Sequence, residues 1–351
     1  MKSIRLVAFL AALCCVQSAG AQQPQPSPNA GRYERVVVHG ASLEGNLAGD
    51  SADRQVSVYL PPGYAKEKRR RYPVLYLLHG FTSSDARWFG LQGRHFVHLP
   101  NAVDAAAARG VKPMIVVMPD ALNKFQGSMY ASSAVIGDWE RFVTRDLVNY
   151  IDGHYRTLAH PESRGLAGHS MGGYGTLRLA MKYPGVFTSL YAMSPCCLDT
   201  DPRPPVEFLE RAAKLTTREE IAAEDFPAKA MVASAASWSP NPRKPPLFID
   251  LPVENGKLVP AILIKWSANS PLVMLDQYIP AMKGYRALVI DAGDEDLAIA
   301  ATVRQLHGAL EGYGIAHGYE IYDGDHVNRI HQRLIEKVLP FFSEQLESAR
   351  N

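Results

Sequence analysis

The chain has 351 residues, 47% hydrophobic and 21% charged, and this is enough apolar sequence to bury one substantial core. Its formal net charge is +2, and both excess charges lie in the first 21 residues, which hold two of the 37 basic residues and none of the acidic ones. The remainder is electrically balanced, which argues against a nucleic-acid-binding protein.

The first 21 residues have the pattern of a secretory signal peptide. Lys2 and Arg5 form a charged start, residues 6–16 an apolar stretch, and residues 19–21 a small-residue cleavage site. The apolar stretch is too short to span a bilayer. We therefore expect a secreted or periplasmic protein without stable membrane insertion. Residues 22–30, rich in Gln and Pro, predict a disordered leader before a single domain over residues 31–351.

Strands and helices alternate along this domain. Residues 36–38 and 56–60 predict two strands, the second alternating as a half-buried edge strand would. The basic run at 66–71 predicts a solvated loop. Continuous apolar runs predict parallel strands covered on both faces at 74–78, 114–118, 189–193 and 287–291. Helical patterns occur at 102–108, 139–150, 175–182, 298–310 and 330–346. The alternation predicts an α/β fold whose mostly parallel central sheet is flanked by helices on both faces.

One long, proline-rich segment at about 198–280 interrupts this alternation. Thr217 with Glu220 three residues later predicts a helix start, and residues 248–253 with 258–265 suggest a hairpin. We interpret the segment as a cap insertion that shapes a substrate pocket. Its aromatic residues could line that pocket, although we favour a small core of their own: Trp238, Trp266 and Tyr278.

The run Gly168-His-Ser-Met-Gly-Gly173 contains the Gly-x-Ser-x-Gly pattern of a nucleophile elbow. An apolar run at 164–167 precedes it and a helical pattern follows it, so Ser170 lies on a strand-to-helix turn. A flexible glycine-rich loop is the alternative, but it would not need this context. Ser170 is therefore the predicted nucleophile.

A serine nucleophile needs a base such as histidine to take its proton. In this type of fold the chain order is serine, acid, histidine, so the base should follow the acid. His326 lies in the loop that follows the strand pattern at 319–322 and precedes a helix, where such a base should stand. The other late histidines fit less well, because His307 and His331 lie inside helical patterns and His317 precedes a strand.

The acid is expected just after the strand that ends near Asp291. Asp291 itself should still belong to that strand. Asp296, on the far side of the turn, is favoured because it can reach back toward the base, and Asp294 is the alternative. The remaining carboxylates are interpreted as solvated turn residues or as a helix cap.

Two backbone N–H groups are candidates for an oxyanion hole. Met171 directly follows the nucleophile, and Phe81 follows the His79-Gly80 pair at the end of the first core strand. We expect His79 itself to be a buried structural residue.

The cysteines do not predict a disulfide framework. Cys14 and Cys15 lie in the signal, and only the neighbours Cys196 and Cys197 remain after it. Adjacent cysteines close only a strained ring, so we expect two free thiols in preference to a vicinal disulfide.

Over about residues 33–345 the chain resembles the esterase D-like esterases. The resemblance rests on residues 59–64, the His79-Gly80 pair, residues 138–142, residues 168–175, and Gly293 followed by Asp296. That family includes feruloyl and acetylxylan esterases, S-formylglutathione hydrolases, siderophore esterases and mycolyltransferases, all on the α/β-hydrolase fold.

The resemblance implies Ser170, Asp296 and His326 as the catalytic triad and Phe81 and Met171 as oxyanion donors. It also implies that residues 139–140 help to position the elbow. The long cap departs from the family pattern, so it leaves the substrate open.

The sequence therefore predicts a secreted serine carboxylic ester hydrolase that works through an acyl-enzyme, without a metal or organic cofactor. Feruloyl, acetyl or other small acyl esters, free or polysaccharide-linked, are the expected substrates. S-formylglutathione is disfavoured as a substrate, because export removes the chain from the compartment where glutathione is abundant. An acyltransferase acting on a sugar or alcohol is the main alternative, and a non-catalytic binding module is a weaker one.

Overall fold

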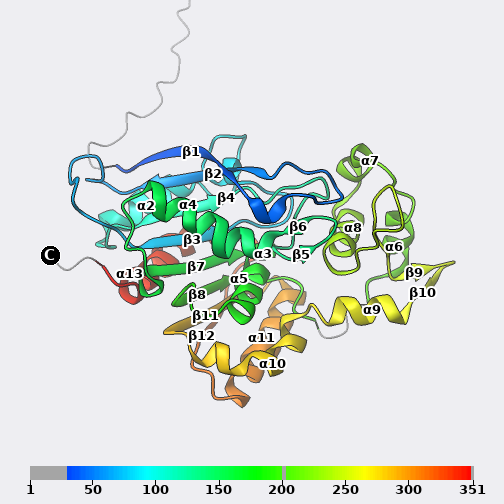
Figure 1. The fold of residues 1–351 in the computed structure, drawn as a ribbon. Helices are drawn as coiled ribbons and strands as arrows, with labels where there is room; N and C mark the ends of the chain where they lie inside the picture. Colours follow the sequence, from blue (N-terminus) through cyan, green and yellow to red (C-terminus); the bar gives the residue numbers. More distant parts are fainter. Residues whose placement is uncertain (1–29, 200–202, 349–351) are drawn as a thin grey trace, which may run out of the picture.

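The computed structural model describes residues 30–199 and 203–348, so the predicted signal and nearly all of the predicted leader lie outside the described residues. An eight-stranded sheet crosses this part of the chain in the order β1-β2-β4-β3-β7-β8-β11-β12 (Figure 1). Its strands are β1 (Arg32–His39), β2 (Asp53–Leu60), β3 (Val74–Leu78), β4 (Ile115–Pro119), β7 (Arg164–His169), β8 (Ser189–Met193), β11 (Ala287–Gly293) and β12 (Gly318–Tyr322).

Six strands pair in parallel: β4, β3, β7, β8, β11 and β12. The other two, β1 and β2, are antiparallel to their neighbours. The apolar runs predicted as parallel strands are thus confirmed to within one or two residues. In β3, Val74 and Tyr76 pack into the core beneath helix α5 (Met171–Lys182), while Leu75 packs into the core on the opposite face. Because both faces are covered, every position of the strand is apolar.

The prediction that 56–60 forms an edge strand is wrong. Strand β1 pairs with β2 over its whole length and supplies the exposed edge, and the last five residues of β2 are all buried. Ser57 produced the misleading alternation. Its hydroxyl is buried and donates a hydrogen bond to Asp85 Oδ2 at 2.6 Å, so a polar residue occupies an interior position.

Helices cover both faces of the sheet, as predicted. One face carries α5 and α11 (Leu297–Gly312) together with the run α3 (Trp139–Arg141), η2 (Phe142–Asp146) and α4 (Leu147–His154). The other face carries α1 (Asp85–Trp88), α2 (Leu99–Ala108) and the run α12 (Ile330–Arg333), η4 (Leu334–Val338) and α13 (Leu339–Gln345).

The proline-rich segment is mostly helical. It contains α6 (Val206–Ala212), α7 (Arg218–Ala223), α8 (Phe226–Trp238), α9 (Pro260–Ser267) and α10 (Pro271–Lys283) (Figure 1). Thr217 begins α7 with a complete capping box that includes Glu220, which confirms that predicted start.

The hairpin predicted over 248–265 is wrong in its extent. Only β9 (Val253–Glu254) and β10 (Lys257–Leu258) pair, around Asn255 and Gly256, which both have positive φ as a tight hairpin turn requires. The chain turns helical at Pro260, because proline at the first helical position presets the helical φ.

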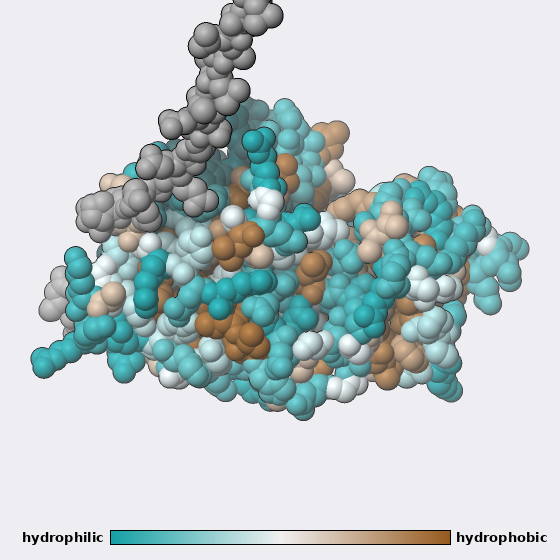
Figure 2. All heavy atoms as spheres, turned by 90° about the horizontal axis from the view of Figure 1, so that it is seen from above, coloured by the Kyte–Doolittle hydropathy of each residue, from teal (hydrophilic) through white to brown (hydrophobic). Residues whose placement is uncertain are grey.

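A helix that crosses a bilayer needs about 20 consecutive, mostly apolar residues. Within residues 30–199 and 203–348, no helix has both the length and the apolar sequence needed to cross a bilayer. On the face drawn in Figure 2, hydrophobic residues form small patches within a mostly hydrophilic surface.

Candidate active site

Ser170 lies between the end of β7 and the start of α5 with φ 58° and ψ −116°. A positive φ is strained for a residue with a side chain, and it is the conformation expected of a nucleophile elbow. Hydrogen bonds hold the turn from both sides: the Ser170 N–H donates to Met193 O at 3.0 Å, and Ser170 O accepts from the N–H groups of Tyr174 and Cys196 at 2.9 and 3.2 Å. The predicted strand-to-helix turn is therefore present.

Glycine is required beside the serine because α5 lies directly against the sheet. A Cβ atom on Gly172 would lie 2.0 Å from Leu78 O of β3, and one on Gly168 would lie 2.2 Å from the backbone of Gly172. Any larger residue at either position would push the helix away from β3 and β7.

Strands β11 and β12 are neighbours, and this brings the loops that follow them together. His326 Nδ1 lies 2.5 Å from Asp296 Oδ2. Asp294 instead accepts a hydrogen bond from the Gly324 N–H at 3.1 Å and so fastens the two loops to each other. Of the two carboxylates considered from the sequence, the structure therefore pairs Asp296 with His326, while Asp291 remains inside β11 as predicted.

The loop of His326 also touches the elbow. The rings of His169 and His326 have centroids 4.7 Å apart, and His169 Nε2 donates to the backbone carbonyl of His326 at 2.8 Å. Among the described residues, Ser170 Oγ makes no hydrogen bond to His326. Serine–histidine hydrogen bonds are often long before substrate binds. A hydrogen bond between Ser170 Oγ and His326 is therefore part of the proposed function.

The loop after β3 lies beside Ser170. A Cβ atom on Gly80 would lie 3.4 Å from Ser170 Cβ, and one on Gly127 would lie within 3 Å of the side chains of both Phe81 and Met171. The backbone N–H groups of Phe81 and Met171 donate no hydrogen bond within the described part of the chain. The side chains of Phe81 and Met171 thus pack near each other at Gly127, and the backbone N–H groups of both residues are unpaired among the described residues.

His79 anchors this loop and is fully buried, as expected of a structural residue. Its Nδ1 donates to Gly80 O at 2.8 Å, its Nε2 accepts from the Ala121 N–H at 2.9 Å, and its backbone carbonyl accepts from the Tyr130 hydroxyl at 3.1 Å. Burial lowers the pKa of the imidazole, which keeps it neutral in this arrangement.

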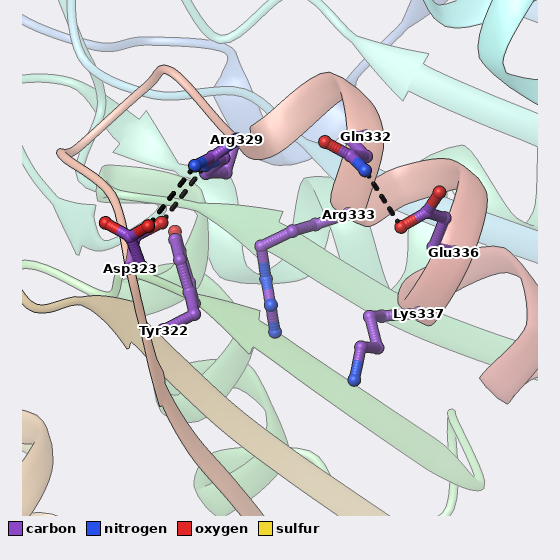
Figure 3. A pocket seen from close by; sticks show the side chains of 7 residues that line it. All are labelled: Tyr322, Asp323, Arg329, Gln332, Arg333, Glu336 and Lys337. Atoms are coloured by element: carbon purple, nitrogen blue, oxygen red, sulfur yellow. Dashed lines mark hydrogen bonds and ion pairs between the residues drawn. The ribbon is translucent and has the colours of Figure 1, made fainter.

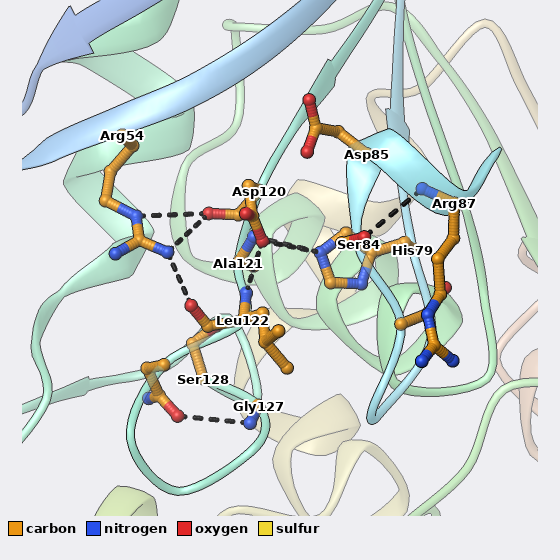
Figure 4. A network of polar contacts seen from close by, with 12 residues as sticks. Arg54, His79, Ser84, Asp85, Arg87, Asp120, Ala121, Leu122, Gly127 and Ser128 are labelled. Atoms are coloured by element: carbon orange, nitrogen blue, oxygen red, sulfur yellow. Dashed lines mark hydrogen bonds and ion pairs between the residues drawn. The ribbon is translucent and has the colours of Figure 1, made fainter. Parts of the chain in front are cut away.

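A polar network behind the loop was missed by the sequence reasoning (Figure 4). Arg54 donates to Asp120 O at 3.0 Å, and buried Asp85 accepts from Arg35 Nη2 at 2.8 Å and from Ser57. The only signal in the sequence was the placement of Asp120 directly after a buried strand. Its partners come from β1 and β2, so local patterns could not reveal them.

Glu140 supports the elbow helix from below. Its side chain is only 1% exposed and accepts a hydrogen bond from Arg178 Nε at 2.8 Å, with Lys182 Nζ as a second partner and the Tyr183 hydroxyl at 3.1 Å. Arg178 and Lys182 belong to α5, so this ion pair fastens α3 to the helix that follows the nucleophile. Burial alone would raise the pKa of Glu140, but the two cations outweigh it and the pKa is lowered.

We expect Glu140→Gln to destabilise the protein by about 3 kcal/mol, because it leaves a buried arginine without its counter-charge. Since the pKa of Glu140 is lower in the folded than in the unfolded chain, its stabilisation is present above about pH 4.5 and is lost as the pH falls through the folded pKa. Urea unfolding of both proteins at pH 7 and near pH 3 checks this. The gap should shrink in acid, and an equal gap at both pH values would contradict it.

A matched control for this prediction is Glu336→Gln. Glu336 pairs with Arg109 at 3.1 Å, but both side chains are largely exposed. Because water screens such a surface pair, its removal should leave the unfolding midpoint nearly unchanged.

A hollow of about 200 Å³ lies between the end of β12 and the last helices (Figure 3). Its cations are already paired: Arg329 with Asp323, Arg333 with Asp291 and Glu320, and Lys337 with Glu320. No predicted site residue lines it. We therefore interpret the charged side chains around this hollow as an ion-pair network that holds β12 against the last helices.

The remaining candidate residues have structural contacts. His307 Nδ1 lies 2.9 Å from His317 Nε2, and His331 Nδ1 accepts from the His98 N–H at 3.4 Å. Cys196 and Cys197 are both free, as expected, with their sulfur atoms 2.6 Å apart. The hydrogen bond between the thiols and burial raise the pKa of Cys196.

The chain is similar to known esterases in sequence and in fold. The family model described as "Putative esterase" matches residues 51–342. Over 136 residues the chain is 40% identical to Esterase Rv1288 of Mycobacterium tuberculosis, which covers 38% of this chain and 27% of that protein. Over 180 residues it is 32% identical to an endo-1,4-beta-xylanase/feruloyl esterase of Xylanibacter ruminicola, which covers 49% of this chain and 24% of that protein. The chain thus spans about a quarter of the length of these curated relatives.

Solved structures with the same fold are more distant in sequence. A ferulic acid esterase is 20% identical with a TM-score of 0.63, covering 90% of this chain and 99% of that one. An S-formylglutathione hydrolase from Staphylococcus aureus is 16% identical with a TM-score of 0.58, covering 89% and 99%. These similarities confirm the predicted α/β-hydrolase fold.

Proposed function

This chain belongs to the "Putative esterase" family, and on that premise we propose that it is a serine carboxylic ester hydrolase with Ser170 as nucleophile, His326 as base and Asp296 as the orienting acid. One observation carries the proposal: a strained elbow serine stands beside a loop whose histidine is hydrogen-bonded to a carboxylate at 2.5 Å. This is the arrangement that activates a serine hydroxyl.

In the first half of the reaction, Ser170 Oγ attacks the ester carbonyl carbon and its proton passes to His326 Nε2. Asp296, bonded to Nδ1, stabilises the imidazolium that forms. The Phe81 and Met171 N–H groups hold the negative oxygen of the tetrahedral intermediate. Collapse of the intermediate breaks the ester C–O bond, and the alcohol leaves with the proton from His326.

In the second half, water attacks the acyl-enzyme. His326 takes a proton from the water and returns one to Ser170 Oγ as the acid is released. No step needs a metal ion or an organic cofactor, and that absence stays a prediction.

We propose small acyl esters as substrates, among them feruloyl and acetyl esters, free or attached to polysaccharide. The names of the xylanase/feruloyl esterase and ferulic acid esterase relatives support the aromatic acyl group. So does the surface near the elbow: Phe226 of α8 is 60% exposed and packs edge-on against Phe81 at 5.4 Å. The proposed cap therefore reaches the oxyanion loop with an apolar side chain.

The other cap aromatics support a core role in place of a pocket. Trp238 and Trp266 are buried and pack against each other at 5.8 Å, and Trp266 Nε1 donates to Ser239 Oγ. Tyr278 is partly buried in α10.

Secretion is also part of the proposal, and it rests on the pattern of the first 21 residues.

A substrate panel tests this function. Methyl ferulate, acetylated xylan, short p-nitrophenyl esters and cyclic siderophore esters should divide into hydrolysed and refused members, with a burst of p-nitrophenol where the acyl-enzyme accumulates. Product analysis with an added sugar or alcohol separates hydrolysis from acyl transfer. Failure on every member, with or without an acceptor, would overturn the proposal and favour a binding module.

A further inference from the structure

His169, the residue before the nucleophile, is buried in a way that the proposed mechanism does not use. It ends β7, is 3% exposed, and lies among the rings of Trp88 at 6.2 Å, Phe96 at 5.6 Å and His326 at 4.7 Å. A polar side chain in such surroundings costs free energy unless it makes a specific hydrogen bond.

The single hydrogen bond of its ring goes to the predicted base. His169 Nε2 lies 2.8 Å from the backbone carbonyl oxygen of His326. A carbonyl only accepts, so Nε2 carries the hydrogen atom and Nδ1 is the bare nitrogen. Nδ1 has no partner among the described residues and lies 3.4 Å from the position that a Cβ on Gly80 would take. The ring thus has one hydrogen bond, to this carbonyl, and one buried nitrogen without a partner in the described chain.

The ring stays neutral at working pH. Burial, and to a smaller extent the nearby His326, lower the pKa of His169 to about 3. A neutral ring donates to the carbonyl without repelling the imidazolium that His326 becomes during the reaction. A cation in the same place would oppose proton transfer from Ser170.

Other hydrogen bonds hold the loop of His326 to the loop after β11: Asp294 accepts from the Gly324 N–H, and Gly324 O accepts from the Glu295 N–H. Asp296 holds the imidazole at Nδ1, and Asp325 accepts from the N–H groups of Val327 and Asn328 within the loop itself. The hydrogen bond from His169 links this loop directly to β7, the strand that leads to the elbow. Since His169 and Ser170 are consecutive, it ties the backbone of the base to that of the nucleophile.

From this geometry we propose that His169 is a positioning residue that holds His326 over Ser170 by donating Nε2–H to the His326 carbonyl. The inference rests on the proposed function, because it assigns His326 as the base. It adds a contact that sets the distance between base and nucleophile. Small errors in that distance lower the rate steeply.

The test compares His169→Phe, which keeps the ring shape and removes the donor, with His169→Gln, whose amide can place an N–H near the former Nε2. With p-nitrophenyl acetate, the Phe variant should lose roughly 10- to 100-fold in kcat with little change in KM. The Gln variant should recover a large part of that loss. His307→Phe is the control and should retain wild-type kcat, because it alters a histidine of α11 that stacks on Tyr319 of β12.

A second measurement does not depend on turnover. Amide hydrogen exchange over residues 323–329 should be roughly two- to tenfold faster in the Phe variant than in the wild type, as expected for one lost hydrogen bond, and slower again in the Gln variant. Wild-type kcat and exchange in His169→Phe would overturn the inference, as would a Gln variant no better than the Phe variant. If the wild type hydrolyses no ester, the proposed function fails and His326 has no role as a base, while the exchange rates still show whether His169 holds the loop of His326.

Discussion

Replacing Ser170 by alanine is expected to reduce ester hydrolysis by about 10⁶-fold, to the level of a protein without its nucleophile. The hydroxyl forms the covalent bond of the acyl-enzyme, and alanine has no group that can form it. The fold should persist, because the turn is held by backbone hydrogen bonds of residue 170 that alanine keeps. The measurement is steady-state hydrolysis of p-nitrophenyl acetate together with covalent labelling by a fluorophosphonate probe, which should also disappear.

Ser163→Ala is the matched control. Ser163 immediately precedes β7 at its opposite end, is fully buried, and donates a hydrogen bond to Glu347 O at 3.1 Å. Its removal should cost about 1 kcal/mol of stability and leave both labelling and turnover near the wild-type level. Labelling that survives in Ser170→Ala would show that another residue is the nucleophile.

Asp296→Asn is expected to lower kcat by about 10⁴-fold with the structure intact. The amide is nearly isosteric with the carboxylate, but it presents the wrong hydrogen-bonding partner to His326 Nδ1 and carries no charge to stabilise the imidazolium. KM should change much less than kcat, because the carboxylate does not touch the substrate. Single-turnover kinetics with a p-nitrophenyl ester separate the chemical step from binding.

The decisive comparison is with Asp294→Asn. Asp294 accepts a hydrogen bond from the Gly324 N–H, and an asparagine oxygen can accept the same bond. The variant should therefore lose less than about tenfold in kcat, the cost of a slightly displaced loop. If it loses as much as Asp296→Asn, the assignment of the acid is incorrect.

Most of the fold could be predicted because its signals are local. The apolar runs of β3 and β8 match the observed strands residue for residue, since a strand covered on both faces needs an apolar side chain at every position. The start of α7 could also be predicted, because a capping box is completed within four residues. Strand β2 was wrongly predicted to lie at the sheet edge, because the hydrogen-bond partner of its buried Ser57 is Asp85, 28 residues away.

The candidate site divides in the same manner. Local patterns indicate the elbow serine, the histidine after the last strand and a short list of acids, because each lies in a recognisable turn next to its own strand. The packing of distant segments sets which carboxylate meets His326, which N–H groups near Ser170 are unpaired, and which side chains Glu140 and His169 contact. Those contacts join segments from different strands and helices, and their distances follow from how the sheet and its helices pack, which no local pattern encodes.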